Sequence, residues 1–270
     1  MSLVDEVQGA SVELRPTQYL ESKRPSGTSA SKTALIVLNS PIPDLEYFRR
    51  LYNHAYFRVC ADGGANRLHD MLVNRLPDAR WAEALRSMPP DVIHGDLDSL
   101  NEIVQQRYEQ LGIEISWDPD QYSTDFGKAV KLVLKRLPEV KEVLITGSLS
   151  GRVDQGIGLL HELYREHKLQ HSGIRFWLFS EASVSTLLAA GTTSIHTPLA
   201  GGLIKRNVGI LPLYGPAKIS TKGLEWDVSD WPTKMGDQVS TSNHIMADCI
   251  TISTDHDVLF TIETSFNRSD

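Results

Sequence analysis

The sequence predicts an α/β domain with a mostly parallel sheet, followed by an all-β domain built as an antiparallel sandwich. In the first half, short apolar runs rich in β-branched residues alternate with segments of helical spacing, as in buried parallel strands joined by helices. After about residue 173, short alternating segments are separated by Gly, Pro and Asp turns. We therefore expect a mobile tail at 1–31, an α/β domain at 32–175 and a β-sandwich at 176–270.

The composition is that of a globular chain. Of the 270 residues, 41% are hydrophobic and 23% are charged, and no run of about 18 apolar residues predicts a membrane span. The net charge of -7 argues against a nucleic-acid partner, since such partners require clustered Lys and Arg. The acidic amino terminus lacks the apolar core of a signal peptide, and the distant Cys60 and Cys249 are expected to be buried thiols. These features predict a cytoplasmic protein.

The first strand is predicted at Ala34–Leu38, and a helix follows at Leu45–Tyr52. A second strand at Phe57–Ala61 runs directly into Asp62, Gly63, Gly64 and Asn66, before a helix at 65–76. Adjacent glycines let backbone amides approach an anion, but a tight turn from strand to helix also requires them. Both interpretations remain open at this point. The segment from Asn74 to Pro90 is expected to be an inserted helix and loop.

Two carboxylates, Asp96 and Asp98, follow the next apolar run, in Asp91–Ser99. Ser99 and Glu102 have the spacing of a capping box, so a helix is expected to begin there. Paired carboxylates at the end of a buried strand can hold a metal ion, although a solvated turn has the same pattern.

A strand at Ile113–Trp117 precedes a loop that ends in a helix beginning near Thr124. This start places Asp125 in the first turn and Lys128 one turn later on the same side of the helix. An acid in a first turn also serves as a cap, because it complements the helix dipole.

The last strands of the first half are predicted at Val143–Thr146 and Ile174–Phe179. Between them, Gly147–Gln155 carries Arg152 and Asp154 at the start of another helix. The segment Glu181–Ala190 is expected to be a short helix or turn. Farther along, Trp226 is interpreted as core or as a ligand contact, and Ser240–Asn243 as a polar contact surface.

Acids and cations thus recur at successive strand ends. The carboxyl ends of parallel strands share one edge of a sheet, so we expect these residues to converge there: Asp62, Asp96, Asp98, Asp125, Asp154, Lys128 and Arg152. Carboxylates that hold Mg²⁺, together with cations that neutralise phosphate charge, suit the transfer of a phosphoryl-type group. A Gly-x-x-x-x-Gly-Lys loop is absent from the sequence, which excludes an ordinary P-loop enzyme.

Six motifs in order resemble those of the thiamin pyrophosphokinases, in particular the eukaryotic, fungal branch. They are Ala61-Asp-Gly-Gly-Ala-Asn66, Gly95-Asp-Leu-Asp-Ser99, Ser123-Thr-Asp-x-x-Lys128, Gly151-Arg-Val-Asp-Gln155, Gly223-Leu-x-Trp226 and Ser240-Thr-Ser-Asn243. The resemblance covers about residues 33 to 265. It implies a homodimeric thiamin diphosphokinase that transfers the diphosphate of ATP to the hydroxyl of thiamin and releases AMP. The active site would lie near the subunit interface.

The resemblance also implies a role for each residue that matches a motif or lies beside one. Asp96, Asp98 and Asp125 would hold Mg²⁺, and the catalytic set would add Lys128, Arg152 and Asp154. The ATP contacts would be Asp62, Gly63, Gly64, Asn66, Thr124, Ser148 and Arg152, and the thiamin contacts would be Gln121, Trp226, Ser240, Ser242 and Asn243.

Two other functions are suggested by parts of the sequence. The Asp96-Leu97-Asp98 loop is similar to the nucleophile loop of haloacid-dehalogenase-like phosphatases, but that family has the loop at its first strand, and two strands precede it here. A non-catalytic thiamin or nucleotide sensor would not need the complete set of acids and cations.

Overall fold

The computed structural model describes residues 12–23, 32–42, 44–74, 80–149, 152–170 and 173–266. Its contacts divide the chain into two units. The α/β unit runs from Tyr19 to Val184 and includes Phe266, and the β unit contains residues 185–265 together with the amino-terminal residues through Gln18.

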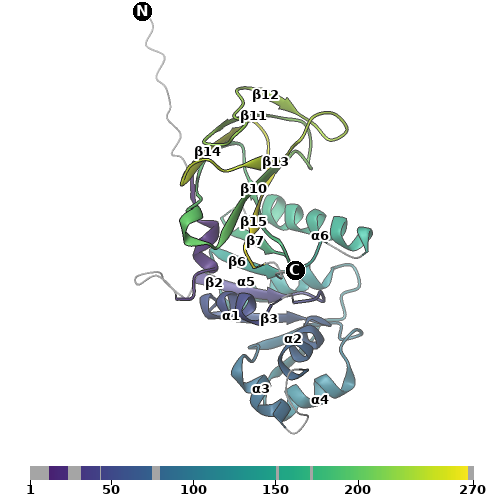
Figure 1. The fold of residues 1–270 in the computed structure, drawn as a ribbon. Helices are drawn as coiled ribbons and strands as arrows, with labels where there is room; N and C mark the ends of the chain where they lie inside the picture. Colours follow the sequence, from purple (N-terminus) through teal and green to yellow (C-terminus); the bar gives the residue numbers. More distant parts are fainter. Residues whose placement is uncertain are drawn as a thin grey trace, which may run out of the picture. The chain divides into compact units, whose positions relative to one another are not determined.

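The α/β unit is built on parallel strands in the order β7-β6-β2-β3-β4-β5 (Figure 1). Their bounds are β2 Thr33–Val37, β3 Phe57–Ala61, β4 Val92–Gly95, β5 Glu114–Trp117, β6 Glu142–Thr146 and β7 Arg175–Phe179. Every residue of β2 is buried, as predicted for a strand covered on both faces. Val37 lies opposite Cys60 and Thr146, so neighbouring strands end at the same edge of the sheet.

The helices of this unit agree with the predicted periodicity. They are α1 Leu45–His54, α2 Gly64–Val73, α3 Trp81–Ser87, α4 Glu102–Gln110, α5 Asp125–Arg136 and α6 Val153–Arg165, which continues into a π-helical turn at 166–170. Helices α2, α3 and α4 lie side by side (Figure 1), while α5 contacts β2, β3 and β4. The predicted helix within 74–90 is α3, whereas residues 75–79 lie outside the described chain.

The β unit contains strands of two sheets: the five-stranded sheet β1-β9-β14-β11-β12, and the strands β13-β10-β15-β8 of the ten-stranded sheet. The bounds are β1 Val12–Leu14, β8 Ser183–Leu188, β9 Gly191–His196, β10 Ile204–Leu211, β11 Ala217–Lys222, β12 Trp231–Thr233, β13 Ser240–His244, β14 Cys249–Thr254 and β15 Val258–Thr264. The pairs β10 with β15 and β9 with β14 are antiparallel, and β1 joins β9 in parallel. The predicted α/β and antiparallel β architecture is confirmed.

Four predictions differ from the structure, and one of them concerns Cys249, which is exposed although both cysteines were expected to be buried. Where a mobile tail was expected, residues 12–20 form β1 and a 3₁₀ helix, and Leu14, Tyr19 and Leu20 are buried. These apolar side chains contact residues far away in the sequence, and such contacts cannot be predicted from the local composition of a polar segment. For example, the Tyr19 ring lies 6.0 Å from the Trp177 ring. Residues 1–11 and 24–31 lie outside the described chain.

The other two differences concern the end of the α/β unit. Glu181–Ala190, expected to be a helix or turn, contains strand β8, because Val184, Leu187 and Leu188 are buried in a sheet. The boundary between the units falls after Val184 rather than at 175/176. No described helix has the length and apolar character needed to cross a membrane.

Candidate active site

Asp62 stands at the sharp turn between β3 and α2. Its φ is 44°, and its backbone N–H donates to the carbonyl of His94 at 3.0 Å. A Cβ on Gly64 would lie 2.1 Å from the carbonyl oxygen of Val37, and one on Gly95 would lie 2.8 Å from Cβ of Asp62. Gly64 and Gly95 are therefore required by the close packing of the strand ends.

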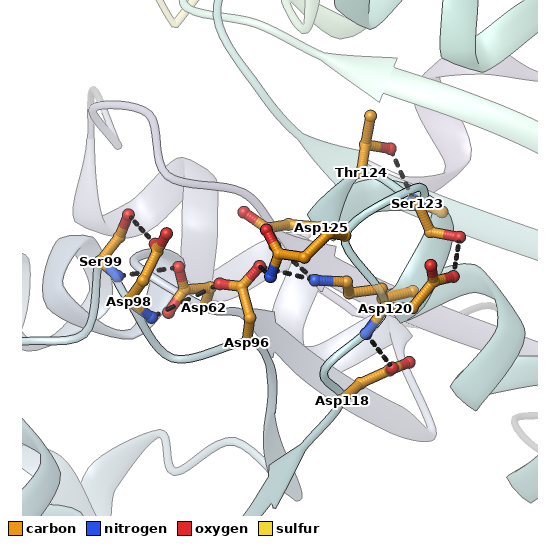
Figure 2. A network of polar contacts seen from close by, with 12 residues as sticks. Asp62, Asp96, Asp98, Ser99, Asp118, Asp120, Ser123, Thr124 and Asp125 are labelled. Atoms are coloured by element: carbon orange, nitrogen blue, oxygen red, sulfur yellow. Dashed lines mark hydrogen bonds and ion pairs between the residues drawn. The ribbon is translucent and has the colours of Figure 1, made fainter.

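Three carboxylates converge at the carboxyl edge of the sheet. One ligand oxygen from each of Asp62, Asp96 and Asp125 lies within 4.8 Å of the other two (Figure 2). The three residues follow β3, follow β4 and begin α5, respectively. We call this set the carboxylate cluster. The predicted metal ligands were Asp96, Asp98 and Asp125, so the cluster shares two residues with that prediction and contains Asp62 as its third member.

Asp62 is the buried member of the cluster. Its Oδ2 accepts a hydrogen bond from the Ser99 N–H at 3.1 Å, while its Oδ1 is buried and accepts none from a described residue. Burial raises the pKa of Asp62, and the nearby carboxylates of Asp98 and Asp96 raise it further against the opposing Ser99 hydrogen bond. A buried carboxylate oxygen without a partner fits a cation ligand.

Lys128 is a buried counter-ion of the cluster. Its side chain is 1% exposed, and its Nζ lies 2.7 Å from Oδ2 of Asp96 and 3.9 Å from Oδ1 of Asp125. The hydrogen bond from Lys128 holds the pKa of Asp96 below its usual value. Burial alone would lower the pKa of Lys128, but Asp96 and Asp125 raise it overall. The structure thus gives Lys128 two carboxylate partners, Asp96 and Asp125.

Asp125 titrates far above an ordinary carboxyl group. Burial, followed by the charges of Asp62 and Asp96, raises its pKa to about 6, although Lys128 opposes the shift. Three carboxylates therefore share one described ammonium group, and the excess negative charge is favourable for a divalent cation. Hard carboxylate oxygens are also the donors that Mg²⁺ prefers, so the residues present fit this metal.

Asn66 and Asp98 fix the loop that follows β4. The Asn66 amide donates to the Ser99 carbonyl at 2.7 Å and accepts from the Asn101 N–H at 3.0 Å. Asp98 donates its backbone N–H to Asp96 at 3.4 Å, and its carboxylate accepts from the Ser99 hydroxyl at 2.9 Å. Asp98 thus lies beside the carboxylate cluster and contributes charge to it. The side chain of Asn66, which is predicted to contact the nucleotide, bonds both Ser99 and Asn101 in this loop.

The start of α5 is tied to the same site and to α6. Gln121 Nε2 donates to Oδ2 of Asp96 at 3.4 Å. Thr124 is the N-cap: its hydroxyl oxygen accepts from the Gly127 N–H at 3.1 Å and donates to Glu162 at 2.9 Å. The sequence analysis did not identify the buried Glu162 as a site residue. The only signal was the presence of an acid on a helix face otherwise rich in apolar residues.

A second polar group missed by the sequence reasoning lies in the loop before α5 (Figure 2). The Ser123 hydroxyl donates to Asp120, and Lys131 donates to Ser123 at 2.7 Å. Asp118 accepts from the Asp120 N–H at 3.0 Å. The run Asp118-Pro119-Asp120 was the available signal, since such residues form turns stabilised by their own side chains.

Arg152 and Asp154 lie outside the carboxylate cluster. They form a bidentate ion pair with each other, with side chains 74% and 64% exposed, and this pair lowers the pKa of Asp154. Ser148 donates its backbone N–H to the Ser40 hydroxyl at 3.2 Å, next to the end of β2. Gly151, part of the same motif, is outside the described chain.

In the β unit, Asn243 holds the loop that carries Trp226. The buried Asn243 amide accepts from the backbone N–H groups of Trp226 and His244, at 3.2 and 2.8 Å, and donates to the Trp226 carbonyl at 2.9 Å. Trp226 itself is 56% exposed, and its ring lies 5.2 Å from that of His244. The tryptophan is therefore not a core residue.

The two predicted serines lie on the same strand, β13. Ser240 is opposite Ile210 of β10, and Ser242 adopts a φ of 55°. Asn243 is the buried exception in the predicted polar surface at 240–243, because its side chain satisfies backbone groups.

Comparison with known families decides what this fold and site belong to. The model described as "Thiamin pyrophosphokinase, catalytic domain" matches residues 48–178, and the one described as "Thiamin pyrophosphokinase, vitamin B1 binding domain" matches residues 192–259. The chain belongs to the thiamin pyrophosphokinase family. The match to both models in this order confirms the resemblance seen in the sequence.

Individual relatives cover nearly the whole chain. Thiamine pyrophosphokinase 1 of Arabidopsis thaliana is 34% identical over 87% of this chain and 87% of its own length. Thiamine pyrophosphokinase of Saccharomyces cerevisiae is 28% identical over 86% of this chain and 85% of its own length. These identities do not favour the fungal members of the family over the plant members as relatives of this chain. The two alternative functions, phosphatase and sensor, find no support in these comparisons.

A solved structure supports the fold as a whole. The crystal structure of yeast thiamin pyrophosphokinase superimposes with a TM-score of 0.81 at 24% identity, covering 98% of this chain and 94% of the yeast chain.

Proposed function

We propose that the protein is a Mg²⁺-dependent thiamin diphosphokinase, which transfers the diphosphate of ATP to the hydroxyl of thiamin and releases AMP. The carboxylate cluster carries the proposal, because it gathers hard metal ligands at the carboxyl edge of a parallel sheet in a chain of this family. The buried Oδ1 of Asp62, which has no hydrogen-bond partner among the described residues, is the most specific feature that fits a cation ligand.

Asp62, Asp96 and Asp125 would hold the metal, with Asp98 adding charge beside them. A bound Mg²⁺ would neutralise the negative charge that develops on the phosphate groups during transfer. The residues of the chain preorganise the site: Lys128 and Gln121 orient Asp96 through its Oδ2. Such positioning matters because diphosphate transfer depends on in-line geometry more than on a strong base.

The phosphate contacts are proposed to come from exposed groups around the cluster. Arg152 is paired with Asp154 in solvent, so exchanging that partner for a phosphate has a small cost. Its planar guanidinium can bind two phosphate oxygens at once. Gly63, Gly64, Thr124 and Ser148 complete the proposed nucleotide side.

The exposed Trp226 is proposed to bind thiamin. Thiamin has a flat pyrimidine and a permanently charged thiazolium, and both interact favourably with an indole face. Asn243 would act indirectly by holding the Trp226 backbone, while Ser240, Ser242 and Gln121 offer polar contacts.

The proposal includes a cytoplasmic homodimer with its active site near the subunit interface. Light scattering of the purified protein should give the mass of two chains. A fully active monomer would contradict this part without affecting the chemistry.

The reaction is tested directly by incubating the protein with ATP, Mg²⁺ and thiamin. We expect AMP and thiamin diphosphate in equal amounts, and loss of both products when EDTA is added. Formation of ADP or free phosphate in place of AMP, or no turnover, would contradict the proposed function.

A further inference from the structure

An open pocket of about 320 Å³ lies beside the edge strand β5 and helix α5, away from the carboxylate cluster. Trp117, at the end of β5, forms one wall, and Lys131, Lys135 and Arg136 of α5 form another. None of the three carboxylates of the cluster lines it. Every lining residue belongs to the α/β unit.

The cations of this pocket differ in how far they are already neutralised. Arg136 forms an ion pair with Glu114, and Lys131 lies 3.5 Å from a carboxylate oxygen of Asp120. Lys135 forms no ion pair with any carboxylate in the described part of the chain. With Asp118 as the acidic lining residue, the α5 wall retains positive charge that an anion can use.

The opposite wall offers a flat ring and a buried hydrogen-bonding group. Trp117 is 66% exposed, which is unusual for so large an apolar side chain. His94 is buried and uses Nδ1 for Ser116, while its Nε2 lies 3.8 Å from Asp118, beyond hydrogen-bond distance. A ligand ring can therefore stack on Trp117 with a polar group directed at His94.

We propose that this pocket is a second ligand site, which binds a phosphorylated flat heterocycle with its ring on Trp117 and its phosphate at Lys135 and Lys131. A phosphate group is matched by two neighbouring ammonium groups, and aromatic stacking accounts for the exposed indole. If the proposed function holds, both AMP and thiamin diphosphate have this chemistry. The binding site itself does not depend on that function.

Lys131 couples this pocket to the carboxylate cluster. Its ammonium group donates to Ser123 at 2.7 Å, in the loop that also carries Gln121, the donor to Asp96. Asp118, Asp120 and Ser123 of this loop are joined to one another by hydrogen bonds and are drawn beside the cluster in Figure 2. A phosphate that recruits Lys131 removes a restraint from the loop, so a bound ligand should inhibit turnover.

The site is tested by titrating AMP and thiamin diphosphate separately into the Mg²⁺-free full-length protein, followed by calorimetry and tryptophan fluorescence. At least one of them should bind and quench fluorescence, and Trp117→Phe should remove that quench. Lys135→Gln should weaken binding about tenfold, as expected for loss of one charge-assisted hydrogen bond. Lys141→Gln removes the same charge from the exposed start of β6 and should leave binding unchanged.

The proposal is overturned if neither compound binds, if the quench survives in Trp117→Phe, or if Lys135→Gln and Lys141→Gln behave alike. Inhibition gives a second readout: Lys135→Gln should keep its basal rate but need about tenfold more of the ligand for half-inhibition. If the ligand inhibits Lys135→Gln and Lys141→Gln equally, the proposed coupling between this pocket and the carboxylate cluster through Lys131 is wrong. Because binding is measured without turnover, these failures are distinct from failure of the proposed reaction.

Discussion

The carboxylate cluster of the α/β unit and the Trp226 loop of the β unit hold their predicted site residues in opposite ways. In the cluster, the candidate ligands interact with one another and with Lys128: Lys128 binds Asp96 directly, and burial together with the neighbouring carboxylates raises the pKa of Asp125. In the loop, Asn243 positions the backbone, while the Trp226 ring remains exposed.

In the carboxylate cluster, the same residues therefore affect both stability and metal binding. In the Trp226 loop, stability and ligand contact depend on different residues. A substitution in the cluster changes buried charge and metal binding together. In the loop, the positioning residue and the proposed contact residue can be changed one at a time. Four predictions use this contrast, in order of decreasing expected effect.

Asp62→Asn should reduce turnover about a thousandfold, since a metal ligand that stabilises transition-state charge contributes several kcal/mol. Its melting temperature without metal should not fall, because the fold disfavours the charged form of this buried carboxyl. Steady-state kinetics and thermal unfolding measure the two effects. Asp98→Asn removes the same charge just outside the cluster and should lose less activity; the reverse ranking would place the metal on Asp98.

Lys128→Met should cost about 3 kcal/mol of stability in the metal-free protein, because it leaves buried carboxylates without their ammonium partner. Added Mg²⁺ should recover more stability in this variant than in the unaltered protein, and the KM for ATP should change little. The half-exposed Lys131 is the matched control, and Lys131→Met should unfold near the normal temperature. A normal melting temperature combined with a raised KM for ATP would instead support a phosphate contact for Lys128.

Mg²⁺ affinity should fall about tenfold between pH 7 and pH 5, because protons compete with the metal for a carboxyl whose pKa is about 6. The sign follows from the raised pKa of Asp125: the group is mostly protonated at pH 5 and ionised at pH 7, so affinity rises with pH and levels off above pH 7. Calorimetric titrations at several pH values measure this curve. Asp125→Asn should remove the step near pH 6, and an unchanged step would assign it to another group.

Trp226→Ala should raise the KM for thiamin about fivefold with little change in melting temperature, the effect expected from losing a stacking contact of about 1 kcal/mol at an exposed ring. Asn243→Ala should also raise this KM, but it should lower stability by about 2 kcal/mol, because backbone groups of Trp226 and His244 lose their partner. If the two variants lose the same stability, the assignment of Asn243 as the positioning residue and Trp226 as the contact residue is wrong.

Local periodicity was sufficient to predict most of the α/β unit. The continuous apolar run at Ala34–Val37 is a fully buried strand, and α5 begins at Asp125, next to the start predicted near Thr124. The prediction failed where burial depends on distant partners. Tyr19 is buried against Trp177, and β8 pairs within a sheet, although neither segment has a clear local pattern.

The sequence by itself determined the class of fold and the kind of chemistry, because strand and helix periods, capping residues and acids at strand ends are local properties of the chain. It also named Asp96 and Asp125 as candidate metal ligands. Only the tertiary structure decided that Asp62 lies with them in the carboxylate cluster and that Lys128 faces Asp96 from within the protein. Those facts depend on the register of β3 against β4 and on the packing of α5 over the sheet. Register and burial arise from contacts between residues far apart in sequence, so they determine which of several plausible carboxylates meet.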